Sequence, residues 1–325
     1  MYISVVVPAY NEESVVELFY ERTKKVLDSI KYDYEIMFVN DGSTDNTFSI
    51  IEDLASRDKR ISFINLSRNF GKEAAITAGI NTAEGDALII IDADLQDPPE
   101  LIPLMIERWE QGYDTVYAKR SRRDNDTFLK KYTALSFYRA MGSISKFEIP
   151  YNTGDYRLLS RRSIVALRSM PENNRFMKGL FAWIGYKQTA IEYDREKRVG
   201  GDTKFNYWKL WNFALDGITA FTTLPLKLAS YVGGVLSLCS FVYGSFVIVK
   251  TLMYGGSVPG YPSLMVVVLF LGGIQLMFLG IFGEYMGRMF DESKRRPLYL
   301  LDKIHQSSVS KKNVDSEKHH SGNPI

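Results

Sequence analysis

Two carboxylates that are separated by one residue follow an apolar run. Asp92 and Asp94 come directly after Ile89, Ile90 and Ile91, and Gln96 lies two residues further on. A short β-branched run that ends in turn residues predicts a buried strand, with the two carboxylates at its carboxyl end. Mg²⁺ and Mn²⁺ bind one or two carboxylates together with substrate phosphates. The segment therefore predicts a metal–diphosphate site, although a solvated turn, in which Asp is common, fits the same residues.

Two earlier segments repeat this arrangement of an apolar run and a polar turn. The run at 3–7 ends at Pro8, which cannot continue a central strand, and the run at 35–39 leads into Asn40 and Asp41 ahead of a helical pattern. Alternating strands and helices predict an α/β fold with a mostly parallel sheet, which binds ligands at the carboxyl ends of its strands. The convergence of three strand ends with polar or acidic turns at one edge of the sheet favours a metal site over three separate solvated turns.

Glycine motifs for phosphate binding are missing from the expected places. The first strand–helix turn, at 8–12, lacks G-x-G-x-x-G, and Gly71-Lys72 lacks the upstream glycine of a phosphate loop because Leu66 occupies that position. A dehydrogenase and a phosphate-loop NTPase are both disfavoured. Without a glycine cradle, a metal ion must neutralise much of the charge of a bound diphosphate.

Five segments in order carry a resemblance to a known family: 8–12, 40–45, 92–99, 154–158 and 195–204. The first three resemble family 2 glycosyltransferases of the GT-A fold. The last two are similar to the polyisoprenyl-phosphate glycosyltransferases, which include dolichyl-phosphate mannose synthase and the bactoprenol glucosyltransferases. The resemblance implies a Rossmann-like GT-A domain and inverting transfer of one sugar from a nucleotide diphosphate sugar to polyprenyl phosphate. UDP-glucose and undecaprenyl phosphate are the expected substrates, with mannose, N-acetylhexosamine and aminoarabinose donors left open.

The same resemblance implies roles for individual residues. Asp94 and Gln96 would bind Mg²⁺ or Mn²⁺. Asp155 would lie beside the sugar and the acceptor phosphate as a base or as an orienter, the latter favoured because a phosphate monoester is already largely ionised near neutral pH. Arg198 would close over the phosphates with its fork-shaped guanidinium. The nucleotide-sugar contacts would come from Pro8, Ala9, Tyr10, Glu12, Asp41, Asp92, Ala93, Arg195 and Lys204.

A basic segment lies between the acidic pair and Asp155. It runs from Lys119 to Arg123 and continues at Lys130 and Lys131. A solvated charged loop is one explanation. The other is a grip on the lipid phosphate, for which we predict Arg120, Arg123 and Lys131.

Two apolar stretches near the C-terminus, about 228–252 and 263–286, each have the length of a membrane-spanning helix. The turn between them has no charge, whereas cations flank the outer ends, so the positive-inside rule predicts that both termini are cytoplasmic. The aromatic segment 205–213 predicts an interfacial helix, with a buried core helix as the alternative. The formal net charge of +2 gives no reason to expect nucleic acid as a partner.

The predicted domains are a cytoplasmic GT-A domain at 1–204, an interfacial region at 205–226, a two-helix transmembrane hairpin at 227–290 and a cytoplasmic tail at 291–325. The tail is predicted to be disordered from His305 onward. The expected location is the inner (plasma) membrane, and analogy with the family favours a homotetramer. Two rival functions stay open: a processive polysaccharide synthase, whose Gln-x-x-Arg-Trp motif this chain lacks, and a catalytically silent membrane scaffold.

Overall fold

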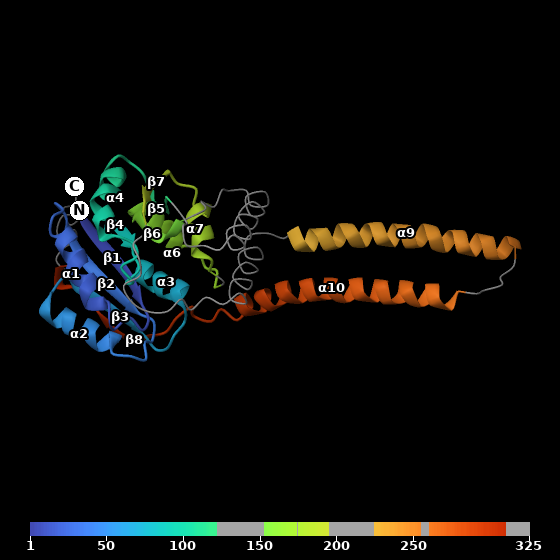
Figure 1. The fold of residues 1–325 in the computed structure, drawn as a ribbon, viewed down its shortest axis with the longest axis horizontal. Coiled ribbons are helices and arrows are strands. Elements are labelled where there is room, and N and C mark those ends of the chain that lie inside the picture. Colours follow the sequence, from blue (N-terminus) through green and yellow to red (C-terminus); the bar gives the residue numbers. More distant parts are fainter. Residues whose placement is uncertain (122–152, 174, 195–223, 255–259, 310–325) are drawn as a thin grey trace, which may run out of the picture. The chain divides into compact units, whose positions relative to one another are not determined.

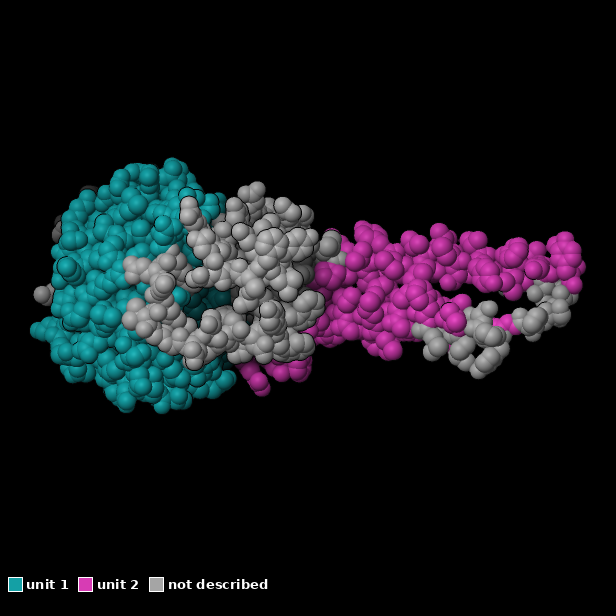
Figure 2. Space-filling model, in the orientation of Figure 1, with its two compact units in different colours: residues 1–211, 297–325 teal, residues 212–296 magenta. Residues whose placement is uncertain are grey.

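The computed structural model describes residues 1–121, 153–173, 175–194, 224–254 and 260–309 (Figure 1). The chain forms two compact units, one made of residues 1–211 and 297–325 and the other of residues 212–296 (Figure 2). The first unit contains the sheet and the second contains two long helices.

The first unit is built on an eight-stranded sheet with the order β7-β5-β6-β4-β1-β2-β3-β8. Parallel pairing joins β1 to both β2 and β4, β2 to β3, and β5 to β7. Only β6 and β8 run against the other strands of the sheet in the described residues. This mixed but mostly parallel sheet confirms the predicted α/β class. The strands are β1 (Tyr2–Ala9), β2 (Asp33–Asn40), β3 (Ile61–Leu66), β4 (Ala87–Ile90), β5 (Thr115–Arg120), β6 (Thr153–Ser160), β7 (Gln188–Tyr193) and β8 (Leu301–His305).

Helices cover both faces of this sheet, as expected for strands that read as continuous apolar runs. One face of β1 presents Val5 and Val7 to a core that also contains residues of α1, α2 and α4, and its other face presents Val6 to α3. A Cβ at Gly79 of α3 would lie 2.3 Å from Val6 Cγ1, so only glycine permits this close packing. The helices of the unit are α1 (Val16–Leu27), α2 (Thr47–Arg57), α3 (Lys72–Thr82), η1 (Pro99–Leu101), α4 (Ile102–Glu110), α6 (Arg161–Arg168) and α7 (Met177–Trp183).

The segment after the second long helix returns to the sheet, which corrects the predicted separate tail. β8 pairs antiparallel with β3, and His305, where disorder was predicted to begin, stacks on Phe63. Ser307 is buried, and its N–H donates to Ser62 Oγ at 3.0 Å. All five residues of β8 are exposed, so the strand carries no buried hydrophobic pattern that sequence analysis could detect. Backbone pairing and surface contacts such as the hydrogen bond from Asn65 to Asp302 hold it on β3. The rest of the predicted tail, from residue 310, lies outside the described residues.

The second unit contains α9 (Leu224–Tyr254) and α10 (Tyr261–Ser293), which form a hairpin (Figure 1). Both are long and apolar enough to cross a membrane, with mean hydropathies of 2.0 and 2.3 in the candidate spans. They extend beyond the predicted boundaries at both ends. Most of the predicted interfacial region, residues 205–223, lies outside the described residues.

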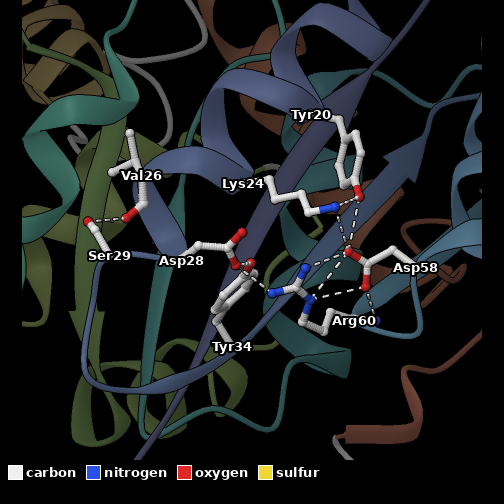
Figure 3. A network of polar contacts seen from close by, with 8 residues as sticks. All are labelled: Tyr20, Lys24, Val26, Asp28, Ser29, Tyr34, Asp58 and Arg60. Atoms are coloured by element: carbon white, nitrogen blue, oxygen red, sulfur yellow. Dashed lines mark hydrogen bonds and ion pairs between the residues drawn. The ribbon is translucent and has the colours of Figure 1, made fainter.

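One network of charged side chains lies at the amino ends of β2 and β3 (Figure 3). Arg60 donates to Asp28 at 2.6 Å and to Asp58 at 2.8 Å, and Tyr20 also donates to Asp58. Burial alone would raise the pKa of Asp58, but the hydrogen bonds from Arg60 outweigh it and lower that pKa. Because ligands bind parallel sheets at the opposite edge, this network is structural: it ties α1 to the connection between α2 and β3.

Candidate active site

A cavity of about 390 Å³ lies at the carboxyl ends of β1, β2 and β4, a volume typical of small-molecule sites. Eight of the residues predicted from the sequence line it: Pro8, Ala9, Tyr10, Glu12, Asp41, Asp92, Ala93 and Asp94. Asn69, Gly71, Lys72 and Ala75, which the sequence analysis did not assign, complete the lining. A larger cavity of about 530 Å³ lies between α3 and the segment 297–301, but its lining contains one carboxylate, so it lacks an acidic pair.

Asp41 organises the turn that opens α3. Its carboxylate accepts the N–H of Phe70 at 2.7 Å and that of Gly71 at 2.9 Å. Desolvation raises the pKa of Asp41, although both backbone hydrogen bonds oppose that effect. Gly42 has a φ of +62°, and a Cβ there would lie 2.3 Å from the carbonyl carbon of Arg68, so the loop after β2 requires glycine. Asp41 therefore shapes the cavity wall, and its contact with the nucleotide stays a prediction.

The loop after β4 presents the predicted metal ligands. Asp94 Oδ1 accepts the N–H of Gln96 at 3.1 Å, across a buried Leu95 whose φ is +59°. The far end of the loop is anchored, because buried Asp97 accepts a hydrogen bond from Tyr193 of β7. In the described part of the chain, no three His, Cys, Asp or Glu side chains group closely enough to hold a metal on their own. An ion at Asp94 would thus need substrate phosphates among its ligands, as Mg²⁺ and Mn²⁺ in phosphate-transfer sites do.

Lys72 joins the cavity to Asp155. Its ammonium lies 2.7 Å from Asp92 Oδ1 and 2.6 Å from Asp155 Oδ2. Desolvation alone would lower the pKa of Lys72, but the charges of Asp155 and Asp92 outweigh it and raise that pKa. Desolvation alone would raise the pKa of Asp155, yet Lys72 above all holds it well below its usual range. Asp155 is therefore a buried carboxylate that stays ionised at neutral pH.

Three further charged side chains surround Asp155. Arg157 donates to the backbone carbonyl of Gly154 at 2.9 Å and stacks on Phe181 with its guanidinium carbon 3.7 Å from the ring centre. Desolvation lowers the pKa of Arg157 to about 10 and also lowers the pKa of Lys178. Glu73 accepts the N–H of Met177 at 3.2 Å, which connects α3 to α7. Together with Lys72, Asp92 and Asp155, these groups form a cluster of three basic and three acidic side chains, in which Lys72 makes the ion pairs with Asp92 and Asp155.

The sequence analysis missed Lys72 and Glu73, although a signal for them exists. The carboxyl end of β3 meets the same edge of the sheet as those of β1, β2 and β4. Polar residues between the end of β3 and the first turn of α3, which begins at Lys72, are therefore candidates by the rule that identified Asp92. The pair Gly71-Lys72 was compared only with a phosphate loop.

Glu73→Gln is expected to stabilise the protein in a pH-dependent way. Burial, followed by the charge of Asp155, raises the pKa of Glu73 from its ordinary value of 4.5 to about 7. The folded state thus binds the proton more tightly than the unfolded state, and the free energy of unfolding falls as pH rises between these two values. Glutamine keeps an oxygen for the N–H of Met177 and removes this loss.

The apparent unfolding temperature in detergent, compared at about pH 5 and about pH 8, measures this effect. The unfolding temperature of Glu73→Gln should exceed that of the wild type by more at the higher pH. Each kcal/mol of added unfolding free energy should raise it by roughly 2–4 °C. Glu107→Gln, on the exposed surface of α4, is the control. An advantage of the same size at both pH values would contradict the assignment.

The predicted lipid-phosphate residues are only partly described. Arg120, at the end of β5, lies beside Tyr193. It also lies close to Gly154, since a Cβ placed on that glycine would be 3.5 Å from Arg120 Nη2. Desolvation alone would lower the pKa of Arg120, but the hydrogen bond to Tyr193 helps to raise it. Arg123 and Lys131 lie outside the described residues, as do the predicted donor-closing residues Arg195, Arg198 and Lys204. Their roles stay predictions.

Comparison with known proteins places these residues in a family. The family model of glycosyl transferase family 2 matches residues 4–167, and that of the GtrB C-terminal hairpin matches residues 224–289. An uncharacterized glycosyltransferase of Synechocystis sp. is 53% identical over 93% of this chain and 95% of its own length. The prophage bactoprenol glucosyl transferase homolog of Escherichia coli is 49% identical over 94% of this chain and 99% of its own. Among solved structures, mannosyl-3-phosphoglycerate synthase from Rubrobacter xylanophilus is similar with a TM-score of 0.47 and 17% identity, covering 66% of this chain and 71% of that one.

Proposed function

This chain belongs to glycosyl transferase family 2 and carries a GtrB C-terminal hairpin, and from this premise we propose that it transfers one glucosyl residue from UDP-glucose to undecaprenyl phosphate. Relatives named bactoprenol glucosyl transferases, 48–49% identical over 93–95% of the chain, support the acceptor and the sugar. The observation that carries the proposal is the contact of one lysine, Lys72, with both the cavity carboxylate Asp92 and Asp155.

The cavity fits a metal-bound nucleotide diphosphate. Asp94 lines it with a carboxylate, and Gln96 follows in the same turn, so these two residues would hold Mg²⁺ or Mn²⁺. When bound, the ion supplies positive charge that stabilises the departing diphosphate. Pro8, Ala9, Tyr10 and Glu12 form the neighbouring wall, which we assign to the base and ribose.

In the proposed reaction, an oxygen of the acceptor phosphate attacks the anomeric carbon of the sugar. A new carbon–oxygen bond forms as the bond from that carbon to the diphosphate breaks, so UDP leaves and the configuration inverts. The phosphate monoester has a second pKa of about 6 and is mostly ionised at neutral pH. The pKa of Asp155 is held far below that of the acceptor phosphate, so Asp155 is poorly suited to remove the last proton of the phosphate. We therefore assign it the role of orienting the reactants.

Cations must bring the two anionic substrates together. Arg120 ends β5 near Gly154, and its Nε is buried without a hydrogen-bond partner among the described residues. We assign Arg120, with Arg123 and Lys131, to the lipid phosphate, and Arg195, Arg198 and Lys204 to the donor phosphates. The donor-phosphate assignments rest on the family resemblance, and those of Arg123 and Lys131 rest on the basic composition of their segment.

The hairpin implies association with a membrane. Uncharged residues between α9 and α10, and cations beyond their outer ends, support a cytoplasmic catalytic unit at the inner (plasma) membrane. We propose a homotetramer by analogy with the family. Neither rival function gains support: the described residues contain two candidate spans, too few for the channel of a processive synthase within one subunit, and a silent scaffold would not need the buried charges around Asp155.

Incubation of the purified protein with undecaprenyl phosphate, Mg²⁺ and radiolabelled nucleotide sugars tests the proposal. The panel contains UDP-glucose, GDP-mannose, UDP-N-acetylglucosamine and UDP-aminoarabinose. We expect label from UDP-glucose to enter the organic phase with one sugar per lipid phosphate, and no transfer when the lipid is omitted. Transfer of another sugar would overturn the donor assignment, and a polymeric product would favour a processive synthase.

A further inference from the structure

Lys72 has a contact pattern that fits a fixed clamp on two carboxylates. It is the first residue of α3, and its ammonium lies 2.7 and 2.8 Å from the two carboxylate oxygens of Asp92 and 2.6 Å from Asp155 Oδ2. An ammonium group has three N–H bonds, so these three oxygens can use all of its donors. In this arrangement Lys72 has no further hydrogen bond to offer to a substrate.

The two clamped carboxylates come from neighbouring, antiparallel strands. Asp92 follows the end of β4, and Asp155 lies in β6, which pairs with β4. The negative charge of Asp155 contributes to the raised pKa values of both Asp92 and Glu73. Without a cation between them, Asp92 and Asp155 would repel each other in a partly desolvated site.

The two oxygens of Asp155 have different environments. Oδ2 contacts Lys72, whereas Oδ1 is buried and has no hydrogen-bond partner among the described residues. A buried carboxylate oxygen that lacks a donor among the described residues is costly to maintain, and a donor supplied by the substrate would satisfy it. Lys178 and Arg157 also lower the pKa of Asp155 by their charges, but the ammonium of Lys72 has the largest such effect.

We propose that Lys72 is a positioning residue for sugar transfer: it clamps Oδ2 of Asp155, keeps that carboxylate charged, and leaves Oδ1 to accept a hydrogen bond from the substrate. The inference rests on the proposed function, because it assumes that Asp155 orients the reactants. It assigns to Lys72 an action through Asp155, distinct from binding the donor diphosphate directly.

Lys72→Met tests this role, because methionine keeps the length of the stem and removes the charge. We expect kcat to fall roughly 10- to 100-fold, the range for losing a hydrogen bond to a charged group, with KM for the donor changed less than about threefold. Lys72→Arg should recover most of the loss. Lys24→Met is the control, since Lys24 on α1 faces Asp58 at 3.6 Å in the network at the opposite edge of the sheet. A rise in KM with kcat unchanged would overturn the proposal in favour of direct donor binding.

A double-mutant cycle separates action through Asp155 from independent action. In an Asp155→Asn background, Lys72→Met should change the residual rate by less than about threefold, because the group on which Lys72 acts is already neutral. Effects that multiply in the double mutant would contradict the clamp.

A stability measurement tests the clamp without any transfer reaction. In Lys72→Met, burial and the charges of Asp92 and Glu73 should raise the pKa of Asp155 above its value in the unfolded chain. The loss of unfolding temperature should then be larger at about pH 8 than at about pH 5, and the difference should shrink in the Asp155→Asn background. A loss that is equal at both pH values indicates only lost packing and overturns the proposal. If the wild type transfers no sugar, the proposed function fails, and this measurement still decides whether Lys72 clamps Asp155.

Discussion

Asp155→Asn is expected to lower the rate of sugar transfer by at least about 100-fold while leaving donor affinity within about threefold. Asparagine has the shape of aspartate but no charge, so Lys72 would keep its contacts with Asp92 and lose its ion pair with the residue at 155. Asp155 is buried in β6 and does not line the donor cavity, so its effect should fall on the transfer step and spare nucleotide binding. Initial rates of label transfer and calorimetric titration with UDP and Mn²⁺ measure the two quantities separately.

Asp114→Asn is the matched control for this variant. Asp114 precedes β5, is paired with Arg162 at 3.3 Å and has a side chain that is 16% exposed, so it loses a comparable ion pair away from the site. We expect its transfer rate to stay near that of the wild type. Equal turnover in Asp155→Asn and the wild type would remove Asp155 from the reaction.

The pH dependence of the same variant decides whether Asp155 is an orienter or a base. An orienter acts on an acceptor that is already ionised, so the ratio of wild-type to mutant rates should stay constant from about pH 5.5 to about pH 8. A base would matter most where the acceptor phosphate still carries its second proton. A ratio that grows toward low pH would therefore contradict the orienter assignment.

The sequence was sufficient to predict the α/β class and most of the donor cavity because both follow from one regularity. Buried parallel strands read as apolar runs, and the polar residues directly after such runs must meet at one edge of the sheet. Asp41, Asp92 and Asp94 were predicted in this way, and all three line the same cavity. The apolar stretches of α9 and α10 were recognised for a similar reason, since length and composition alone suffice.

Features that depend on contacts distant in the sequence were not predictable. β8 has no buried residue and follows the hairpin, more than 230 residues after its partner Asn65, so neither periodicity nor proximity indicated it. The contact of Lys72 with Asp155 depends on α3 and β6 meeting across the sheet edge, which only the strand order reveals. Asp97 resembled one more acidic turn residue, yet it is 1% exposed and accepts a hydrogen bond from Tyr193. These residues act through contacts with residues far away in the sequence, and a local sequence pattern does not indicate such contacts.

Asp94→Ala is expected to abolish the increase in UDP affinity that Mn²⁺ produces in the wild type and to lower transfer by at least about 1000-fold. Asp94 contributes a carboxylate to the cavity wall, and no described cluster of three metal-binding side chains could replace it. Because the first strand–helix turn provides no glycine cradle, few backbone donors are available to neutralise a diphosphate in place of the ion. Calorimetric titrations with UDP, performed with and without Mn²⁺, measure the effect on binding.

Chelation and a control at the other end of the same strand complete this test. EDTA should stop transfer by the wild type, and added Mn²⁺ or Mg²⁺ should restore it, whereas Asp94→Ala should not respond to either ion. Asp86→Ala is the control, because Asp86 lies just before β4, at the end of the strand opposite to Asp94. Its carboxylate accepts the N–H of Tyr2 and lies 4.0 Å from the amino group of Met1, away from the cavity. This variant should retain the full response to Mn²⁺. A wild-type protein that transfers sugar equally well in EDTA would show that a metal ion is not needed to stabilise the departing diphosphate, and the assignment of Asp94 and Gln96 as metal ligands would then be wrong.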